Sequence, residues 1–257
     1  MELALDSMAP MAVAFIMVVA RMSGLFLVAP LIASPLLPMR VRLMMLVVFS
    51  AMLTPVMATG YVVPDSGSVL ALGIGQEVII GLAMGYAVSL IFAAIQVGAN
   101  MIDLSSGFAL ANVVDPLSQS QGAVFGAFYT IVASLIFLAM NGHHMLIEGF
   151  VASYQLVPMN GQLDVGALMS NLYEQFGLLF ANAFRIAAPV IVTLLLTDVV
   201  LGLVARVVPQ MNVFFLGLPA KIGLGMTAIV LSLPMFAQFF EARITDIAAG
   251  VAVLAGA

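Results

Sequence analysis

The sequence predicts an all-α integral membrane protein, and its charge content is the first reason. Of its 257 residues, 64% are hydrophobic and 7% are charged, with 7 Lys+Arg and 12 Asp+Glu. A soluble domain carries about 25% charged residues, so these few charges cannot cover a globule of this size. Disorder needs low hydrophobicity and is excluded. What remains is a membrane protein or a subunit buried in an apolar assembly.

The second reason is a series of long apolar segments, since a spanning helix needs about 20 apolar residues. No stretch alternates polar and apolar residues over ten positions, which disfavours spanning strands. Pro30, Pro189 and Pro234 within apolar segments predict broken helices packed against neighbours. The six strong segments are 8–32, 43–59, 78–102, 116–147, 176–204 and 222–240, with a weaker one around 144–157.

Small residues and loop charges add two expectations about packing and orientation. Gly81 and Gly85 form a Gly-x-x-x-Gly pair that lets helices approach closely, and packing within the chain is its simpler meaning. Basic residues in loops 34–42 and 205–221 place both loops inside, with the N-terminus outside. Arg243 disagrees with this orientation.

Signals for catalysis, cofactors or nucleic acid are missing from the sequence. There is no Cys, no Gly-x-Ser-x-Gly, no phosphate-binding loop and no basic cluster. His143 and His144 are adjacent, so they cannot share one metal face of a helix. His144 and Glu148 could share a face, but two ligands are too few for a closed metal site. We therefore expect no enzyme, cofactor or metal.

Charges inside the apolar segments are better functional candidates. Arg21 lies in the middle of its segment, where burial costs about 2.5–3.5 kcal/mol on the insertion scale, so it needs a carboxylate, carbonyls or water. Glu77 opens the third segment, where a helix dipole would stabilise it. Arg185 and Asp198 share a segment thirteen residues apart, too far to pair along a helix. A secondary transporter using these four charges is one alternative function.

The stretch 103–121, DLSSGFALANVVDPLSQSQ, joins two apolar segments and has an apolar middle. Asp115-Pro116 breaks any helix there, because the residue before proline avoids the α region. Such a stretch is either a plain surface turn or a loop that lines or closes a conduit. In the second case apolar side chains would close it by dewetting. The candidate plug residues are Gly107, Phe108, Leu110, Val113, Val114, Asp115 and Pro116.

Several blocks of this sequence resemble the FliR family, the R component of the flagellar type III export gate, which also has counterparts in virulence secretion. The blocks are 75–85, 107–116, 137–143 and 208–219, and 29–42 also fits. The motif residues are Gln76, Gly81, Asn141, Gly142, His143, Pro209, Gln210, Met211, Asn212, Gly217 and Pro219.

The resemblance implies a structural pore subunit rather than an enzyme. It implies one export-gate domain over 1–257, with six to seven partly broken helices arranged as bent hairpins and a pore plug at 103–121, centred on 107–121. FliP and FliQ would be its partners in a pore with one R subunit, alongside FlhB and FlhA, and Arg21, Arg185 and Asp198 would then face partner subunits rather than lipid. Unfolded flagellar substrates would pass through it in the bacterial inner membrane at the flagellar basal body. A virulence system is the other setting that the resemblance allows.

The chain departs from the family pattern at three places. Asp103, Ser105 and Ser106 stand where the family often has Gly, Gln and Met. This places an additional carboxylate beside the expected gate and removes a Met from it. His144 replaces an apolar residue, and Val208 replaces a common Ala.

Overall fold

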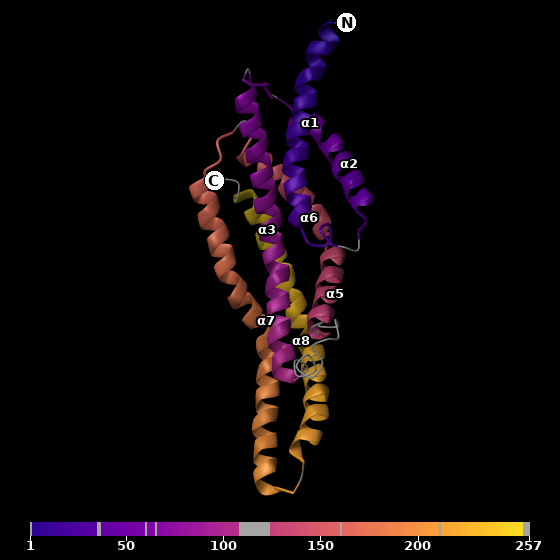
Figure 1. Cartoon of the computed structure of the whole chain (residues 1–257), viewed down its shortest axis with the longest axis vertical. Helices are drawn as coiled ribbons and strands as arrows, with labels where there is room; N and C mark the ends of the chain where they lie inside the picture. Colours follow the sequence, from indigo (N-terminus) through magenta and orange to yellow (C-terminus); the bar gives the residue numbers. More distant parts are fainter. Residues whose placement is uncertain are drawn as a thin grey trace. The chain divides into compact units, whose positions relative to one another are not determined.

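The computed structural model describes residues 2–34, 37–59, 61–64, 66–107, 124–159, 161–210 and 212–253. All regular structure within these ranges is helical, which confirms the all-α prediction (Figure 1). Five of these described helices are long and apolar enough to cross a membrane, and a bent pair of helices meets the same criteria when taken as one span. The helices are α1 (Glu2–Val28), α2 (Met39–Met57), α3 (Gly67–Ser106), α5 (Val124–Ala139), α6 (Gly142–Leu156), α7 (Val165–Val207) and α8 (Val213–Val253).

The bent pair corrects the prediction of one continuous segment over 116–147. α5 ends at Ala139, α6 begins at Gly142, and the two helices meet at 67°. Asn141 between them has φ 59° and ψ 35°, a left-handed conformation that Asn tolerates better than most residues. The weaker segment around 144–157 is therefore the second arm of this pair.

Helix ends also differ from the apolar segments. α7 continues past Arg206 and α8 contains Lys221, so both basic residues belong to helices rather than to a loop over 205–221. Pro30 lies in the turn after α1, whereas α7 and α8 continue through Pro189 and Pro234. Among the described residues, the short break that bends a span is at Asn141 rather than at these prolines.

The chain divides into two compact units. The first comprises 1–90, 141–176 and 244–257, and the second comprises 91–140 and 177–243. α3, α7 and α8 each contribute residues to both units. The single domain over 1–257 stays a prediction.

Close packing of α1 on α3 organises the first unit. A Cβ added to Gly24 would lie 2.5 Å from the carbonyl oxygen of Val78, and one added to Gly81 would overlap the carbonyl oxygen of Arg21. A Cβ at Gly85 would lie 2.9 Å from the carbonyl oxygen of Leu25. The Gly81–Gly85 pair therefore serves packing within the chain, as expected.

Aromatic rings fill the core of the second unit. Phe92 of α3 makes edge contacts with Phe137 of α5 and Phe240 of α8, at centroid separations of 6.1 and 5.6 Å. Tyr129 and Phe236 lie 5.2 Å apart in the same way. Such edge-to-face pairs stabilise beyond their buried area, and these join α3, α5 and α8.

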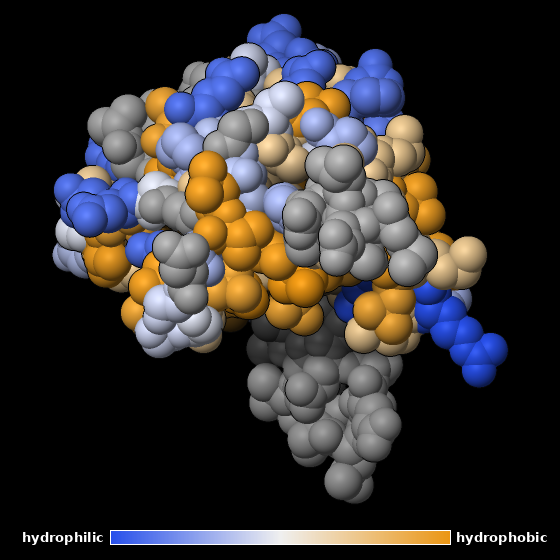
Figure 2. Space-filling model, turned by 90° about the horizontal axis from the view of Figure 1, so that it is seen from above, coloured by the Kyte–Doolittle hydropathy of each residue, from blue (hydrophilic) through white to orange (hydrophobic). Residues whose placement is uncertain are grey.

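Large apolar side chains also remain on the surface. In α3, 67% of the most apolar 18-residue stretch is buried. The corresponding share is 28% in α7, 22% in α8 and 11% in α2. Figure 2 shows hydrophobic side chains reaching one face of the molecule between hydrophilic ones. Lipid or other protein must cover this surface.

Replacing Gly81 by Ala should destabilise the protein by about 1–3 kcal/mol, because the new methyl group overpacks the α1–α3 contact. Gly75→Ala is the matched control on α3, since nothing lies within 4 Å of its added Cβ. The control should be neutral or slightly stabilising. Unfolding in detergent measures both variants, and equal stabilities would contradict the packing role of Gly81.

Candidate functional site

A buried arginine lies at the centre of the first unit. Arg21 is 0% exposed and Glu77 of α3 is 3% exposed. The guanidinium donates to both carboxylate oxygens, from Nε to Oε2 and from Nη2 to Oε1, the latter at 3.0 Å. This bidentate contact is the geometry in which an arginine binds a carboxylate most strongly.

The α6 region supplies the remaining acceptors. Nη1 of Arg21 donates to Oγ of Ser153 at 2.9 Å, and Nη2 donates to the carbonyl oxygen of Val157 at 3.0 Å. The Ser153 hydroxyl in turn donates to the carbonyl oxygen of Phe150 at 2.7 Å. Every guanidinium nitrogen of Arg21 thus has an acceptor, as a buried charge requires.

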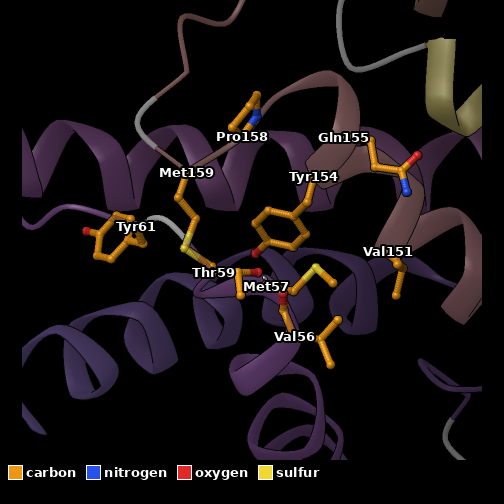
Figure 3. A pocket seen from close by; sticks show the side chains of 9 residues that line it. All are labelled: Val56, Met57, Thr59, Tyr61, Val151, Tyr154, Gln155, Pro158 and Met159. Carbon is orange, nitrogen blue, oxygen red and sulfur yellow. Dashed lines mark hydrogen bonds between the residues drawn. The ribbon is translucent and has the colours of Figure 1, made fainter. Parts of the chain in front are cut away.

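Tyr154 covers the ion pair from one side. Its ring centroid lies 3.6 Å from Cζ of Arg21, and its hydroxyl donates to Oε2 of Glu77 at 3.4 Å. The ring also borders a cavity of about 360 Å³ between the end of α2 and the end of α6. Figure 3 shows Tyr154 reaching toward Met57 and Thr59 in this cavity.

The predictions for Arg21 and Glu77 had different outcomes. The expectation that Arg21 needs a carboxylate or carbonyls is confirmed. The explanation of Glu77 by a helix N-terminus is wrong, because α3 begins ten residues earlier, at Gly67. Glu77 instead lies within the helix as the partner of Arg21. Ser153, Tyr154 and Val157 were not predicted. Spacing along a helix could not have indicated Val157, because it lies beyond the end of α6 and accepts through its backbone carbonyl.

Asp103 forms a second buried polar contact, in the second unit. It lies in the last turn of α3 and is 6% exposed. Its Oδ1 accepts from the backbone N–H of Phe125 at 3.2 Å, and its Oδ2 accepts from that of Gly126 at 3.4 Å. These donors belong to the first turn of α5, whose N–H groups have no partners within the helix. Asp103 therefore caps α5 from another helix.

The charges of α7 behave differently from Arg21. Asp198 does not pair with Arg185, as predicted, but with Lys221 of α8 at 2.5 Å. Lys221 also donates to the carbonyl oxygen of Ser105 at 3.3 Å, at the C-terminal end of α3. A cation is favourable there because the helix dipole is negative at that end. Arg185 is exposed.

The other predicted residues are dispersed. Gln76 is half-buried, Gly142 and Gly217 are buried, and Gly107 follows α3 in a turn with φ 88°. Phe108, Leu110, Val113, Val114, Asp115, Pro116 and Met211 lie outside the described residues. The exposed motif residues are Asn141, His143, Pro209, Gln210, Asn212 and Pro219. Among the described residues, no three His, Cys, Asp or Glu side chains gather into a metal-binding group.

Comparison with known proteins identifies the family. The model of the family called bacterial export proteins, family 1, matches residues 12–247. The chain belongs to this family, whose curated relatives include FliR proteins. It is 30% identical over 228 residues to the flagellar biosynthetic protein FliR of Escherichia coli K12, covering 88% of this chain and 87% of that protein.

Two further relatives of this export family match over shorter lengths. FliR of Bacillus subtilis 168 is 35% identical over 158 residues, which is 60% of this chain and 61% of the Bacillus protein. The surface presentation of antigens protein SpaR of Shigella flexneri is 30% identical over 146 residues, 57% of this chain and 56% of SpaR. The predicted resemblance to FliR is thus confirmed.

Breaking the buried ion pair should be costly, whereas removing both charges should not. Arg21→Met or Glu77→Leu leaves one uncompensated buried charge and should lower the free energy of unfolding by about 3–5 kcal/mol. The double variant should cost much less than the sum of the two. Denaturant unfolding in detergent micelles measures this cycle.

Lys221→Met is the control for that cycle, because the Lys221–Asp198 pair is partly exposed, at 18% and 47%. An exposed pair contributes about 0–1 kcal/mol. Additive effects of the two substitutions at Arg21 and Glu77 would show that the pair is not coupled.

Asp103→Ala should cost about 0.5–2 kcal/mol, the usual range for a lost helix cap. Hydrogen exchange at Phe125 and Gly126 should quicken selectively, and Asp103→Asn should lie between Ala and wild type because its amide oxygen still accepts. Asp164→Ala is the control, since Asp164 caps α7 locally by accepting from N–H of Ala167 at 3.0 Å. Unchanged exchange in α5 after Asp103→Ala would contradict capping across helices.

Proposed function

We propose that this chain is a structural, non-catalytic pore subunit of a flagellar type III export gate. It assembles with FliP-type and FliQ-type subunits in the bacterial inner membrane, at the flagellar basal body. FlhB-type and FlhA-type components adjoin the gate, and unfolded flagellar substrates pass through it. Membership of the export family and the names of the relatives support this assignment.

The observation that carries the proposal is the length of the exposed apolar surface. α7 has 43 residues, about 64 Å at 1.5 Å per residue, whereas the hydrocarbon core of a bilayer is about 30 Å thick. Large apolar side chains are exposed near both ends of α7, from Val165 at 56% to Val207 at 79%. A bilayer covers roughly half of this length. Partner subunits of similar apolar character would cover the rest.

The Arg21 network also supports a structural role over a transporter. A transported ion or solute needs donors or acceptors that are free to bind it. Both carboxylate oxygens of Glu77 and all three guanidinium nitrogens of Arg21 are already engaged within the chain. Asp198 is likewise paired with Lys221. A transporter remains testable, because it alone predicts solute uptake by liposomes that contain only this chain.

The relatives favour flagellar over virulence export. E. coli FliR matches over 88% of this chain at 30% identity and B. subtilis FliR over 60% at 35%, against 57% at 30% for SpaR. The plug over Gly107 to Gln121 stays a prediction.

The test is assembly. Tagged chain co-expressed with FliP-type and FliQ-type subunits should recover both in detergent as one complex, because these subunits cover its exposed apolar surface. An unrelated polytopic membrane protein co-expressed in the same way controls for nonspecific association. A stable, monodisperse monomer that binds neither subunit would overturn the proposed function.

A further inference from the structure

Arg185 lies in the middle of α7 and has no partner among the residues that the structure describes. Arg21 has Glu77, Lys221 has Asp198, Arg42 donates to the carbonyl oxygen of Ser34, and Arg243 lies over the ring of Phe239. Arg40 and Arg206 lie in the first turn of α2 and the last turn of α7. Among the described residues, no acceptor or carboxylate engages Arg185.

The backbone carbonyl of Arg185 also lacks its usual hydrogen-bond donor within the helix. An α-helical carbonyl accepts from the N–H four residues later, and for Arg185 that residue is Pro189. Proline has no N–H, so the helix ladder does not supply the carbonyl of Arg185 with a donor. An exposed guanidinium and a carbonyl without its helical donor thus occur at one point of α7.

A largely apolar cavity borders this point. It has a volume of about 330 Å³ and is lined from α7 by Phe184, Arg185 and Pro189, and from α8 by Ser232, Met235 and Phe239, among others. The hydroxyl of Ser232 is already used, donating to the carbonyl oxygen of Ile229 at 2.9 Å. The cavity therefore presents apolar and aromatic walls with Arg185 as its charged group.

We propose that this cavity is a docking site for an apolar helix of a partner subunit that carries an Asp or Glu, with its carboxylate paired to Arg185. The proposal rests on the proposed function, because it names the chemistry of one interface within that assembly. Charge complementarity decides the occupant. A cation among apolar side chains needs an anion on whatever covers it, and an apolar helix fits the aromatic walls.

A protein carboxylate fits this site better than a lipid head group. Arg185 lies about 30 Å from either end of α7 at 1.5 Å per residue. Exposed apolar side chains flank it along the helix on both sides, with Phe180 and Phe184 before it and Val192 and Leu195 after it. A head group lies at the boundary of an apolar zone, whereas Arg185 lies inside one.

The experiment uses the complex assembled from the full chain and its FliP-type and FliQ-type partners. Arg185→Glu should lower recovery of at least one partner by roughly tenfold or more, because attraction becomes repulsion. Arg185→Gln should lower it less, and Arg40→Glu, at an exposed arginine of α2, should leave it unchanged. Since Arg185 has no partner among the described residues, unfolding of the isolated variants in detergent should be unaffected.

A zero-length crosslink identifies the carboxylate. In the Arg185→Lys complex, a carbodiimide should couple the new amine to an Asp or Glu of a partner, located by mass spectrometry of the joined peptides. Exchanging that acidic residue for Arg should restore assembly with Arg185→Glu.

Three outcomes would overturn the proposal. One is normal assembly of Arg185→Glu without any crosslink from the Lys variant. Another is loss of bound phosphatidylglycerol from Arg185→Gln with unchanged subunit composition, which assigns the site to a lipid head group. If the wild-type chain recovers no partner, the proposed function falls together with this interface.

Discussion

The buried pairing of Arg21 with Glu77 is the constraint around which the first unit is built. A guanidinium that is 0% exposed cannot be tolerated unless each donor finds an acceptor. One acceptor group comes from α3, another from α6 and a third from the turn after α6. Three chain segments must therefore meet at one side chain. The glycines at 24 and 81 allow this, because they let the α1 and α3 backbones approach within reach of the pair.

The same constraint explains what the sequence could and could not predict. Long uncharged runs located the helices except at the bent pair α5–α6, but they marked helix ends where a charge occurs. For α3 this failed, because Glu77 is neutralised by Arg21 and the helix continues back to Gly67. That Arg21 needs a carboxylate follows from the cost of burying it. Which carboxylate it finds does not, since Glu77 is 56 residues away in the sequence.

Local backbone chemistry sets a similar limit on prediction. Asn141-Gly142 interrupts an apolar run whose composition is otherwise suited to one spanning helix, and the left-handed Asn141 turns the chain by 67° into α6. On α6, Ser153 and Tyr154 contact Arg21. Asp103 escaped prediction for a related reason: capping residues usually precede their helix directly, whereas Asp103 reaches α5 from the end of α3. The family motifs at Gly81 and Asn141 thus mark positions where backbone geometry decides the packing.

The few charges of this chain also show how an apolar protein can retain cations. Arg21 is satisfied wholly within the fold, and Lys221 is satisfied between two helices at a partly exposed site. Arg185 has neither arrangement, and its helix is too long for a bilayer to cover. A monomer in lipid would bear the full cost of that charge, whereas a subunit can leave it for a neighbour to neutralise. Arg185 among exposed apolar side chains, without a partner among the described residues, is therefore a physical argument for assembly that is independent of family membership, and it indicates the face of α7 on which to look for the partner.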